Sequence, residues 1–332
     1  MTTSKFITNS FILALILIAL TIADLCFGSI NLFSLHSSDP LFSTILYDIR
    51  LPKTITSIIA GACLALCGLL MQSLFRNPLA GPYVLGVSSG SSLFVAVATM
   101  LISSIHISEF YIMGKGIITL FSILGAFIVT LIILVVSKKN KSNVTVLLVG
   151  LMLAQILGAL QGLIEYVSNA DNLKTFILWG MGSAGSTTAQ DLYIIIPVVL
   201  LAIMSSFFFI KPLNAILLNE QYAKNLGVNV DGLRLSIIII TAVLVGVITA
   251  FCGPIAFVGI SVPIASRLIF KTSHHLHQII FCLLLGACVV LLADVICQIA
   301  SNQFMLPINT VTTLIGSPVV IYLLFKSKFS IG

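Results

Sequence analysis

Charged side chains are scarce in this chain: Asp, Glu, Lys and Arg make up only 8% of its 332 residues, while hydrophobic residues make up 59%. A soluble domain carries roughly 25% charged residues, so this chain has too few to cover a surface that faces water. Its apolar runs are long enough, at about 20 residues each, to cross a lipid bilayer. The composition therefore excludes a soluble protein and indicates an all-α, polytopic membrane protein.

The sequence also lacks the motifs of common catalytic and nucleotide-binding sites. It contains no Walker A loop, no H-E-x-x-H and no G-x-S-x-G. The seven cysteines lie in or beside apolar runs without forming a C-x-x-C pair, which is typical of small buried hydrophobes. We assign all five histidines to loops, including the solvated H-H-L-H stretch at 274–277. We expect no catalytic residue, cofactor or metal site in this chain.

The apolar runs and their breaks predict about ten transmembrane helices in a single domain spanning residues 1–332. The predicted spans are 8–28, 53–73, 83–103, 115–137, 144–166, 191–210, 235–252, 256–270, 277–298 and 307–325. An even number places both termini on one side. Twelve basic residues then fall on that side and four on the other, so the positive-inside rule makes both termini cytoplasmic.

Acidic residues at membrane depth are rare. Glu165 lies near the outer end of its predicted span, and Asp294 is the one acid that we place deep in the membrane. Asp294 could carry protons or cations, as ionisable groups do in many transporters. It could instead hydrogen-bond a neighbouring helix, which we favour because no second acid or histidine shares its span.

Two segments combine glycine, proline and serine in similar order. "AGPYVLGVSSG" at Ala80–Gly90 enters the membrane from the inside in this topology, and "CGPIAFVGISVP" at Cys252–Pro263 enters from the outside. Interrupted segments in opposite orientation suggest an inverted repeat, a feature of many transporters.

The most polar cytoplasmic passage is Leu217–Arg234. It contains a helix-like piece, Glu220–Leu226, followed by Gly227, and glycine commonly ends helices in this way. The passage is longer than an ordinary connection, so we expect a small ordered helix on the inner face that docks another protein.

Several stretches, in order along the chain, resemble the FecCD-type permease subunits of ABC importers for iron–siderophores, haem and cobalamin. They are Arg50–Gly90, Leu148–Leu160, Leu178–Leu192, Ala223–Arg234, Gly253–Leu268, Leu291–Asp294 and Leu306–Leu324. The resemblance implies a ten-helix subunit in the cytoplasmic membrane that pairs with a second permease subunit, two ATPase subunits and an external substrate-binding protein. ATP and Mg²⁺ would bind to the ATPase. The resemblance favours a ferric siderophore as substrate and leaves haem and cobalamin open; a proton-coupled secondary transporter using Asp294 is the alternative.

The resemblance also implies roles for particular residues. Docking of the binding protein would use Arg50 and Lys53. Coupling to the ATPase, within 217–234, would use Asn219, Glu220, Tyr222, Ala223, Leu226 and Gly227. The inner gate and the pathway would use Asn77, Pro78, Leu79, Ser88, Ser89, Ser142 and Asn143.

The sequence departs from the family pattern at four positions. Ile264 replaces a common histidine, Gln298 stands where an arginine often follows "LAD", and Met305 and Asn309 replace a glutamate and a glycine. The missing arginine suggests that the two permease subunits differ in their docking charges. We therefore expect the second permease to be a different chain.

Overall fold

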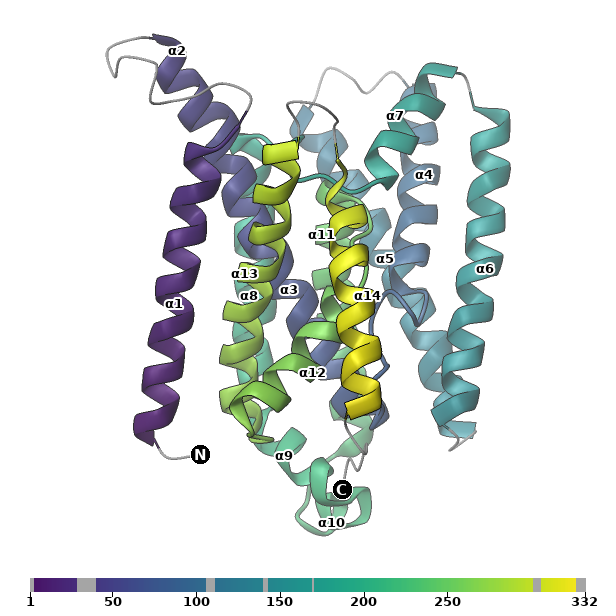
Figure 1. Cartoon of the computed structure of the whole chain (residues 1–332). Helices are drawn as coiled ribbons and strands as arrows, with labels where there is room; N and C mark the ends of the chain where they lie inside the picture. Colours follow the sequence, from purple (N-terminus) through teal and green to yellow (C-terminus); the bar gives the residue numbers. More distant parts are fainter. Residues whose placement is uncertain are drawn as a thin grey trace.

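The computed structural model describes residues 3–28, 40–105, 111–139, 143–168, 170–300 and 306–326. Within these ranges the chain is helical with connecting turns and contains no strand. Figure 1 shows the longer helices standing side by side as one bundle, with α10 projecting beyond its lower end.

Ten helices coincide in position with the ten predicted spans. They are α1 (Thr3–Cys26), α3 (Leu51–Phe75), α4 (Val87–Ile105), α5 (Tyr111–Lys139), α6 (Asn143–Val167), α8 (Ala189–Phe207), α11 (Val230–Cys252), α12 (Val258–Phe270), α13 (His275–Ala300) and α14 (Ile308–Lys326). The shorter helices are α2 (Pro40–Ser43), the π-helix η2 (Thr44–Arg50), α7 (Ala170–Gly180), α9 (Ile210–Leu218) and α10 (Glu220–Asn225).

Among the described residues, seven helices are long and apolar enough to cross a membrane by length and composition. The remaining apolar stretches, Val87–Met100, Val258–Phe270 and Ile308–Tyr322, are shorter. At 1.5 Å per residue, the 13 residues of α12 reach about 20 Å, less than the roughly 30 Å of a hydrocarbon core. The structure thus confirms a multi-pass helical protein, and the number of ten crossings stays a prediction.

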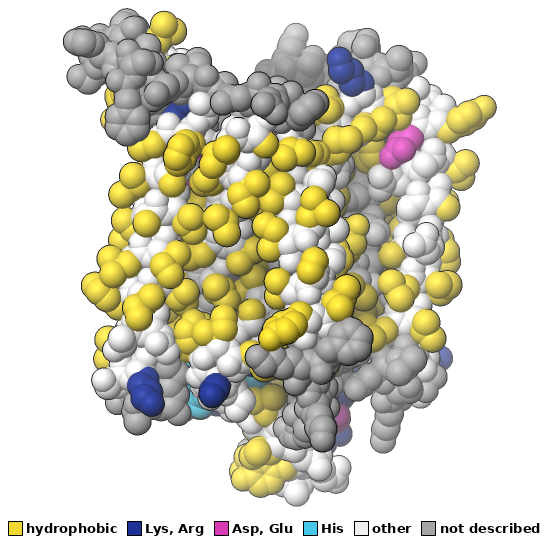
Figure 2. Space-filling model, in the orientation of Figure 1, with side chains coloured by type: hydrophobic (Ala, Val, Ile, Leu, Met, Phe, Trp, Pro, Cys, Tyr) yellow, Lys and Arg dark blue, Asp and Glu magenta, His cyan; other side chains and the backbone are white. Residues whose placement is uncertain are grey.

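The outer surface of the bundle matches a lipid environment. Figure 2 shows hydrophobic side chains over the middle of the visible face, with Lys and Arg side chains towards the two ends. The spans of α1 and α6 have only 6% of their residues buried, against 78% for the span that contains α3. These two helices therefore lie at the periphery, and α3 lies in the core.

Glycines let the core helices approach α3 closely. A Cβ on Gly61 would lie 2.1 Å from the carbonyl oxygen of Gly286 on α13, and a Cβ on Gly68 would lie 1.6 Å from that of Gly259 on α12. Small residues at such crossings are typical of helix packing in membranes, where backbones approach each other directly.

The two Gly-Pro breaks predicted from sequence lie against each other. The first leads through a turn into α4, and the second separates α11 from α12. A Cβ on Gly81 would lie 2.4 Å from Cγ1 of Ile260, and a Cβ on Gly259 would lie 2.8 Å from Cδ of Pro82. The breaks therefore form one close contact inside the bundle, while the inverted-repeat relationship itself stays a prediction.

Candidate translocation and coupling sites

Arg50 lies directly before α3, at the helix end where it was predicted. Its side chain, however, is buried. The residue is only 8% exposed. Its Nη1 donates to the carbonyl oxygens of Leu25 at 2.6 Å and Cys26 at 3.1 Å, at the end of α1. In this conformation Arg50 caps α1, whose last carbonyl groups have no partners within their own helix.

Lys53, one turn further along α3, forms an ion pair with the buried acid on α13. Its Nζ lies 2.8 Å from Oδ1 of Asp294, and the Ser57 hydroxyl donates to Oδ2 of Asp294 at 2.9 Å. Asp294 is 1% exposed. Both its carboxylate oxygens are therefore engaged by α3, so this acid bonds a neighbouring helix.

Sequence reasoning missed a second buried acid in the same region. Asp24, near the end of α1, is 1% exposed and accepts hydrogen bonds from Thr54 at 2.5 Å and from Gln298 at 2.5 Å. It lies within the first predicted span, 8–28, and was not among the acids considered there. The expectation that only Glu165 and Asp294 are candidate membrane acids was wrong, and Gln298 contacts Asp24 from α13.

An open cavity of about 370 Å³ lies above this group of charges. Its lining includes Asp24, Arg50, Lys53, Asp294 and Gln298. We call these five residues the outer charge cluster. Its two carboxylates face two basic groups, so the buried charges balance, as buried ionic groups must. The cavity is also lined by Gly182, Ser183, Gly185 and residues 306–308.

The predicted inner gate is a compact turn between α3 and α4, here called the inner turn (Arg76–Gly86). Arg76 ends α3 in the left-handed conformation with φ 49°. The side chain of Asn77 accepts a hydrogen bond from the backbone N–H of Leu79 at 3.0 Å, and the carbonyl of Asn77 accepts from Ala80. Asn77 thus folds the chain back on itself, and Pro78 follows within the same turn.

Leu79 packs with an apolar cluster on α12 and α14. Ile260, Ile264 and Val320 form this cluster, and Ile264 is 3% exposed. The position where the family often has histidine therefore makes an apolar contact with the predicted gate. Ser88 is buried and Ser89 half-buried in the first turn of α4. Ser142 lies outside the described residues, and Asn143 is the first residue of α6.

The short helix predicted within 217–234 is present as α10. Asn219 caps it by accepting a hydrogen bond from the N–H of Gln221 at 3.0 Å, and Gly227 follows with φ 80°. Tyr222 is 49% exposed and Leu226 60% exposed, while Ala223 is fully buried against the underlying structure. The helix therefore presents two apolar side chains outward, which suits a docking surface.

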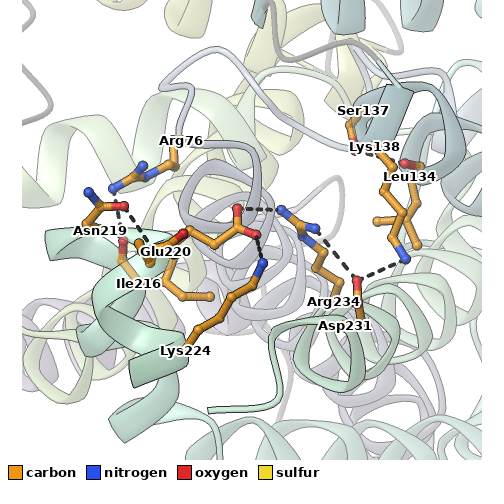
Figure 3. Close-up of polar contacts among 11 residues, drawn as sticks. Arg76, Leu134, Ser137, Lys138, Ile216, Asn219, Glu220, Lys224, Asp231 and Arg234 are labelled. Atoms are coloured by element: carbon orange, nitrogen blue, oxygen red, sulfur yellow. Dashed lines mark hydrogen bonds and ion pairs between the residues drawn. The ribbon is translucent and has the colours of Figure 1, made fainter. Parts of the chain in front are cut away.

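Ion pairs link α10 to α11, and α11 to the end of α5 (Figure 3). Glu220 pairs with Lys224 at 3.2 Å and Arg234 at 2.9 Å, and Asp231 pairs with Arg234 at 3.7 Å and Lys138 at 2.9 Å. Burial acts to raise the pKa of Glu220, but the hydrogen bond from Lys224 and the charges of Arg234 and Lys224 outweigh it, so the pKa is lowered.

The H-H-L-H stretch does not form the solvated loop that we expected. His275 is the first residue of α13, is 2% exposed, and contacts Ser73 and Asn214. The ring centroids of His277 and Phe6 lie 4.4 Å apart. Across the described part of the chain, no three His, Cys, Asp or Glu residues gather in a way that could hold a metal ion.

These features define the class: a multi-pass helical membrane protein with a charged cavity at one end and a short polar helix, α10, at the other. A model described as the FecCD transport family matches residues 11–326. The chain belongs to this family, whose members are permease subunits of ABC importers; such subunits form the translocation path, and a partner ATPase hydrolyses ATP.

Curated relatives include vitamin B12 import system permease proteins named BtuC. The one from Salmonella newport is 35% identical over 326 residues, covering 95% of this chain and 94% of that protein. The one from Klebsiella pneumoniae is 34% identical over 291 residues, covering 85% and 83%.

Solved structures agree with this assignment. A transporter assigned to the metal-chelate type of ABC transporter, in an inward-facing conformation, is 30% identical with a TM-score of 0.82, covering 96% of this chain and 99% of that chain. PsaBC from Streptococcus pneumoniae is 15% identical with a TM-score of 0.57, covering 87% and 95%, which shows a shared fold alone.

Proposed function

We propose that this chain is the permease of an ATP-driven importer that moves a metal chelate across the cytoplasmic membrane by alternating access between two permease subunits. The observation that carries the proposal is the family match over residues 11–326, combined with a docking helix at the end of the bundle richer in basic residues. On the positive-inside rule, this end and both termini are cytoplasmic.

The comparisons support a metal chelate as the substrate class. Vitamin B12 and ferric siderophores are both metal chelates, the class named for the similar solved transporter. Sequence reasoning favoured a ferric siderophore, and the names of the BtuC relatives favour cobalamin. Vesicles containing the whole transporter should take up one of these chelates only with ATP and the binding protein. Uptake of radioactive iron as a siderophore, tested with and without unlabelled cobalamin, decides between the two. Iron uptake that cobalamin does not reduce favours the siderophore, and absence of iron uptake favours cobalamin.

The exposed helix α6 supports a path between two permeases. Its span is only 6% buried, and Cβ atoms on Gly158 and Gly162 would meet nothing within 4 Å. Polar Gln155 is also exposed on this helix. An exposed polar and small-residue face is unfavourable towards lipid but suits a second helix or an aqueous path.

The second permease is proposed to be a different chain, because Gln298 replaces a docking arginine and contacts Asp24. Purification through a tag on this chain should yield a second, different permease subunit. A complex with two copies of this chain and no other permease would exclude that composition.

Arg50 and Lys53 are proposed to guide the binding protein to the outer cavity. Since Arg50 caps α1 and Lys53 pairs with Asp294, an acidic group on the binding protein would have to compete for them. Their proposed role is to orient docking rather than to hold it, because each cation already has partners within the chain. Replacing both by Glu should weaken docking more at low salt than at high salt.

Coupling to the ATPase is proposed to run through α10, with Tyr222 and Leu226 on its exposed face. Glu220→Lys would oppose Lys224 and Arg234, and Gly227→Pro would forbid the φ of 80°. The double variant should hydrolyse ATP without uptake while the spans still fold. Unchanged transport would remove the coupling role of this segment.

The alternative is proton-coupled transport through Asp294. It predicts uptake by this chain alone, abolished by a proton uncoupler and by Asp294→Asn. The ion pair with Lys53 favours a structural role for Asp294, because a proton carrier must change its charge during transport.

A further inference from the structure

Helix α9 links the coupling helix to the membrane bundle. Only Asn219 separates α9 from α10, and α9 packs against both α3 and α13. Its inward residues Leu213 and Ile216 are 1% and 5% exposed. Helix α9 therefore lies between α10 and the core helices α3 and α13.

A chain of hydrogen bonds joins α9 to α13 and α3 at this point. Asn214 on α9 lies 2.9 Å from Nδ1 of His275, and Nε2 of the same ring lies 2.8 Å from the Ser73 hydroxyl on α3. Ser73 and His275 are 4% and 2% exposed. Three helices thus meet through one buried imidazole.

The direction of each bond can be assigned. The backbone N–H of His275 donates to Oδ1 of Asn214 at 2.9 Å, which fixes the amide orientation because an N–H cannot face an NH₂ group. An amide oxygen only accepts, so Nδ1 of His275 carries the proton and donates to it. Nε2 of His275 then accepts from Ser73, and Nδ2 of Asn214 donates to Nε2 of His274 at 3.3 Å.

A second bond ties α9 to the inner turn. Nη2 of Arg76 donates to the carbonyl of Ile216 at 3.1 Å. Arg76 lies three residues after Ser73 and begins the inner turn that carries the predicted gate. Helix α9 is therefore linked to the last turn of α3 through His275, and it accepts a bond directly from Arg76, the first residue of the inner turn.

We propose that Ser73, His275 and Asn214 are positioning residues that transmit movement of the docked coupling helix to α3 and the inner turn. The inference rests on the proposed function, because it assigns the route between the ATPase and the gate. Apolar packing alone would hold α9 in place, but helices packed that way slide more freely. Directed hydrogen bonds fix both the rotation and the depth of α9 relative to α3.

The test uses matched substitutions in the complete transporter, purified with its ATPase and reconstituted in vesicles with the binding protein. In Ser73→Thr the hydroxyl is kept. In Ser73→Val the side chain has the shape of Thr but no hydroxyl. We expect Ser73→Val to lower uptake per ATP hydrolysed at least about fivefold relative to Ser73→Thr, the lower end of typical coupling between sites. Equal ratios for the two variants would overturn the inference.

A second pair tests the other end of the chain. Asn214→Asp keeps an oxygen that accepts from His275, and Asn214→Leu does not. The Leu variant should lose coupling and the Asp variant keep it, and combining Asn214→Leu with Ser73→Val should add little further loss, since residues of one network are not additive. This pair decides the question if Ser73→Val fails to assemble. Full additivity of the double variant would contradict a shared route.

Two controls separate structural damage and failure of the proposed function. Ser206 on α8 is fully buried and bonds only within its own helix, to the carbonyl of Ile203 at 2.6 Å. Ser206→Val should keep the ratio of the wild type, and a loss there equal to that of Ser73→Val would overturn the inference. Wild-type uptake that needs neither ATP nor the ATPase would instead overturn the proposed function.

Discussion

At the scale of single residues, the outer charge cluster holds α1, α3 and α13 together. Lys53→Met would leave Asp294 buried with no cation beside it. Removing one partner of a buried ion pair costs about 3–5 kcal/mol. Because the Lys53 side chain is 18% exposed, we expect the lower end, near 3 kcal/mol.

Thermal unfolding of the purified chain in detergent measures this effect. Lys53→Met should lower the midpoint, and Lys53→Met with Asp294→Asn should recover part of the loss, because Asn has no charge to bury. Lys174→Met, at an exposed lysine on α7, is the control and should leave the midpoint unchanged. A Lys53→Met variant with the same midpoint as this control would contradict a structural role for the Lys53–Asp294 pair.

Glu220 gives the coupling helix a dependence on pH. Its pKa is lowered in the folded chain, so the ionised form stabilises α10 above the unfolded-state pKa of about 4.3, and this is lost as the pH falls through the folded pKa. The side chain is 36% exposed, so we expect at most about 1 kcal/mol. The protection factor of the amides in α10, which is corrected for the intrinsic pH dependence of exchange, should fall with acidification, and Glu220→Gln should remove that change. An identical acid response in the variant would assign it to another group.

Local features could be predicted from the sequence, and distant partners could not. The end of α10 just before Gly227 and the breaks at 80–90 and 252–263 follow from residues that act on their own backbone. The bond between Asp24 and Gln298 joins residues 274 positions apart, and that between Asn214 and His275 joins residues 61 apart. No local pattern records such pairs, which explains why Asp24 and His275 were missed.

At the scale of helices, the crossing of α3 and α12 depends on Gly68. A Cβ there would lie 1.6 Å from a backbone oxygen, so no side-chain movement can relieve the clash. Overpacking costs typically about 1–3 kcal/mol, and we expect Gly68→Ala to reach at least the upper end. Gly116→Ala on α5 is the matched control, because a Cβ there meets nothing within 4 Å. Unfolding in detergent compares the two; equal midpoints would mean that the helices separate at little cost.

The lengths of the helices explain why the number of crossings is harder to predict than their positions. Each predicted span falls on a helix, because apolar runs and breaks are local signals. The second break divides α11 from α12, and the chain between them runs within the bundle, where a Cβ on Gly253 would lie 2.2 Å from the carbonyl oxygen of Trp179. A non-helical passage at this depth is tolerated only where protein surrounds it.

At the scale of the whole molecule, the arrangement of the ends predicts the topology. The start of α1 and the end of α14 lie at the same end of the bundle as α10, and α7 lies at the other (Figure 1). Both chain ends and α10 should therefore face the cytoplasm if the positive-inside rule holds.

Labelling of single introduced cysteines by a membrane-impermeant maleimide tests this topology. The two sites are Tyr222 on α10, which is 49% exposed, and Lys174 on α7, which is also exposed. Each is replaced by Cys in a separate variant. Background labelling should be low, since six of the seven native cysteines are buried and Cys26 is half-buried. Tyr222→Cys should react in inside-out vesicles and Lys174→Cys in right-side-out vesicles. The reverse pattern would place α10 outside, where no ATPase could reach it, and would contradict the coupling role as well as the topology.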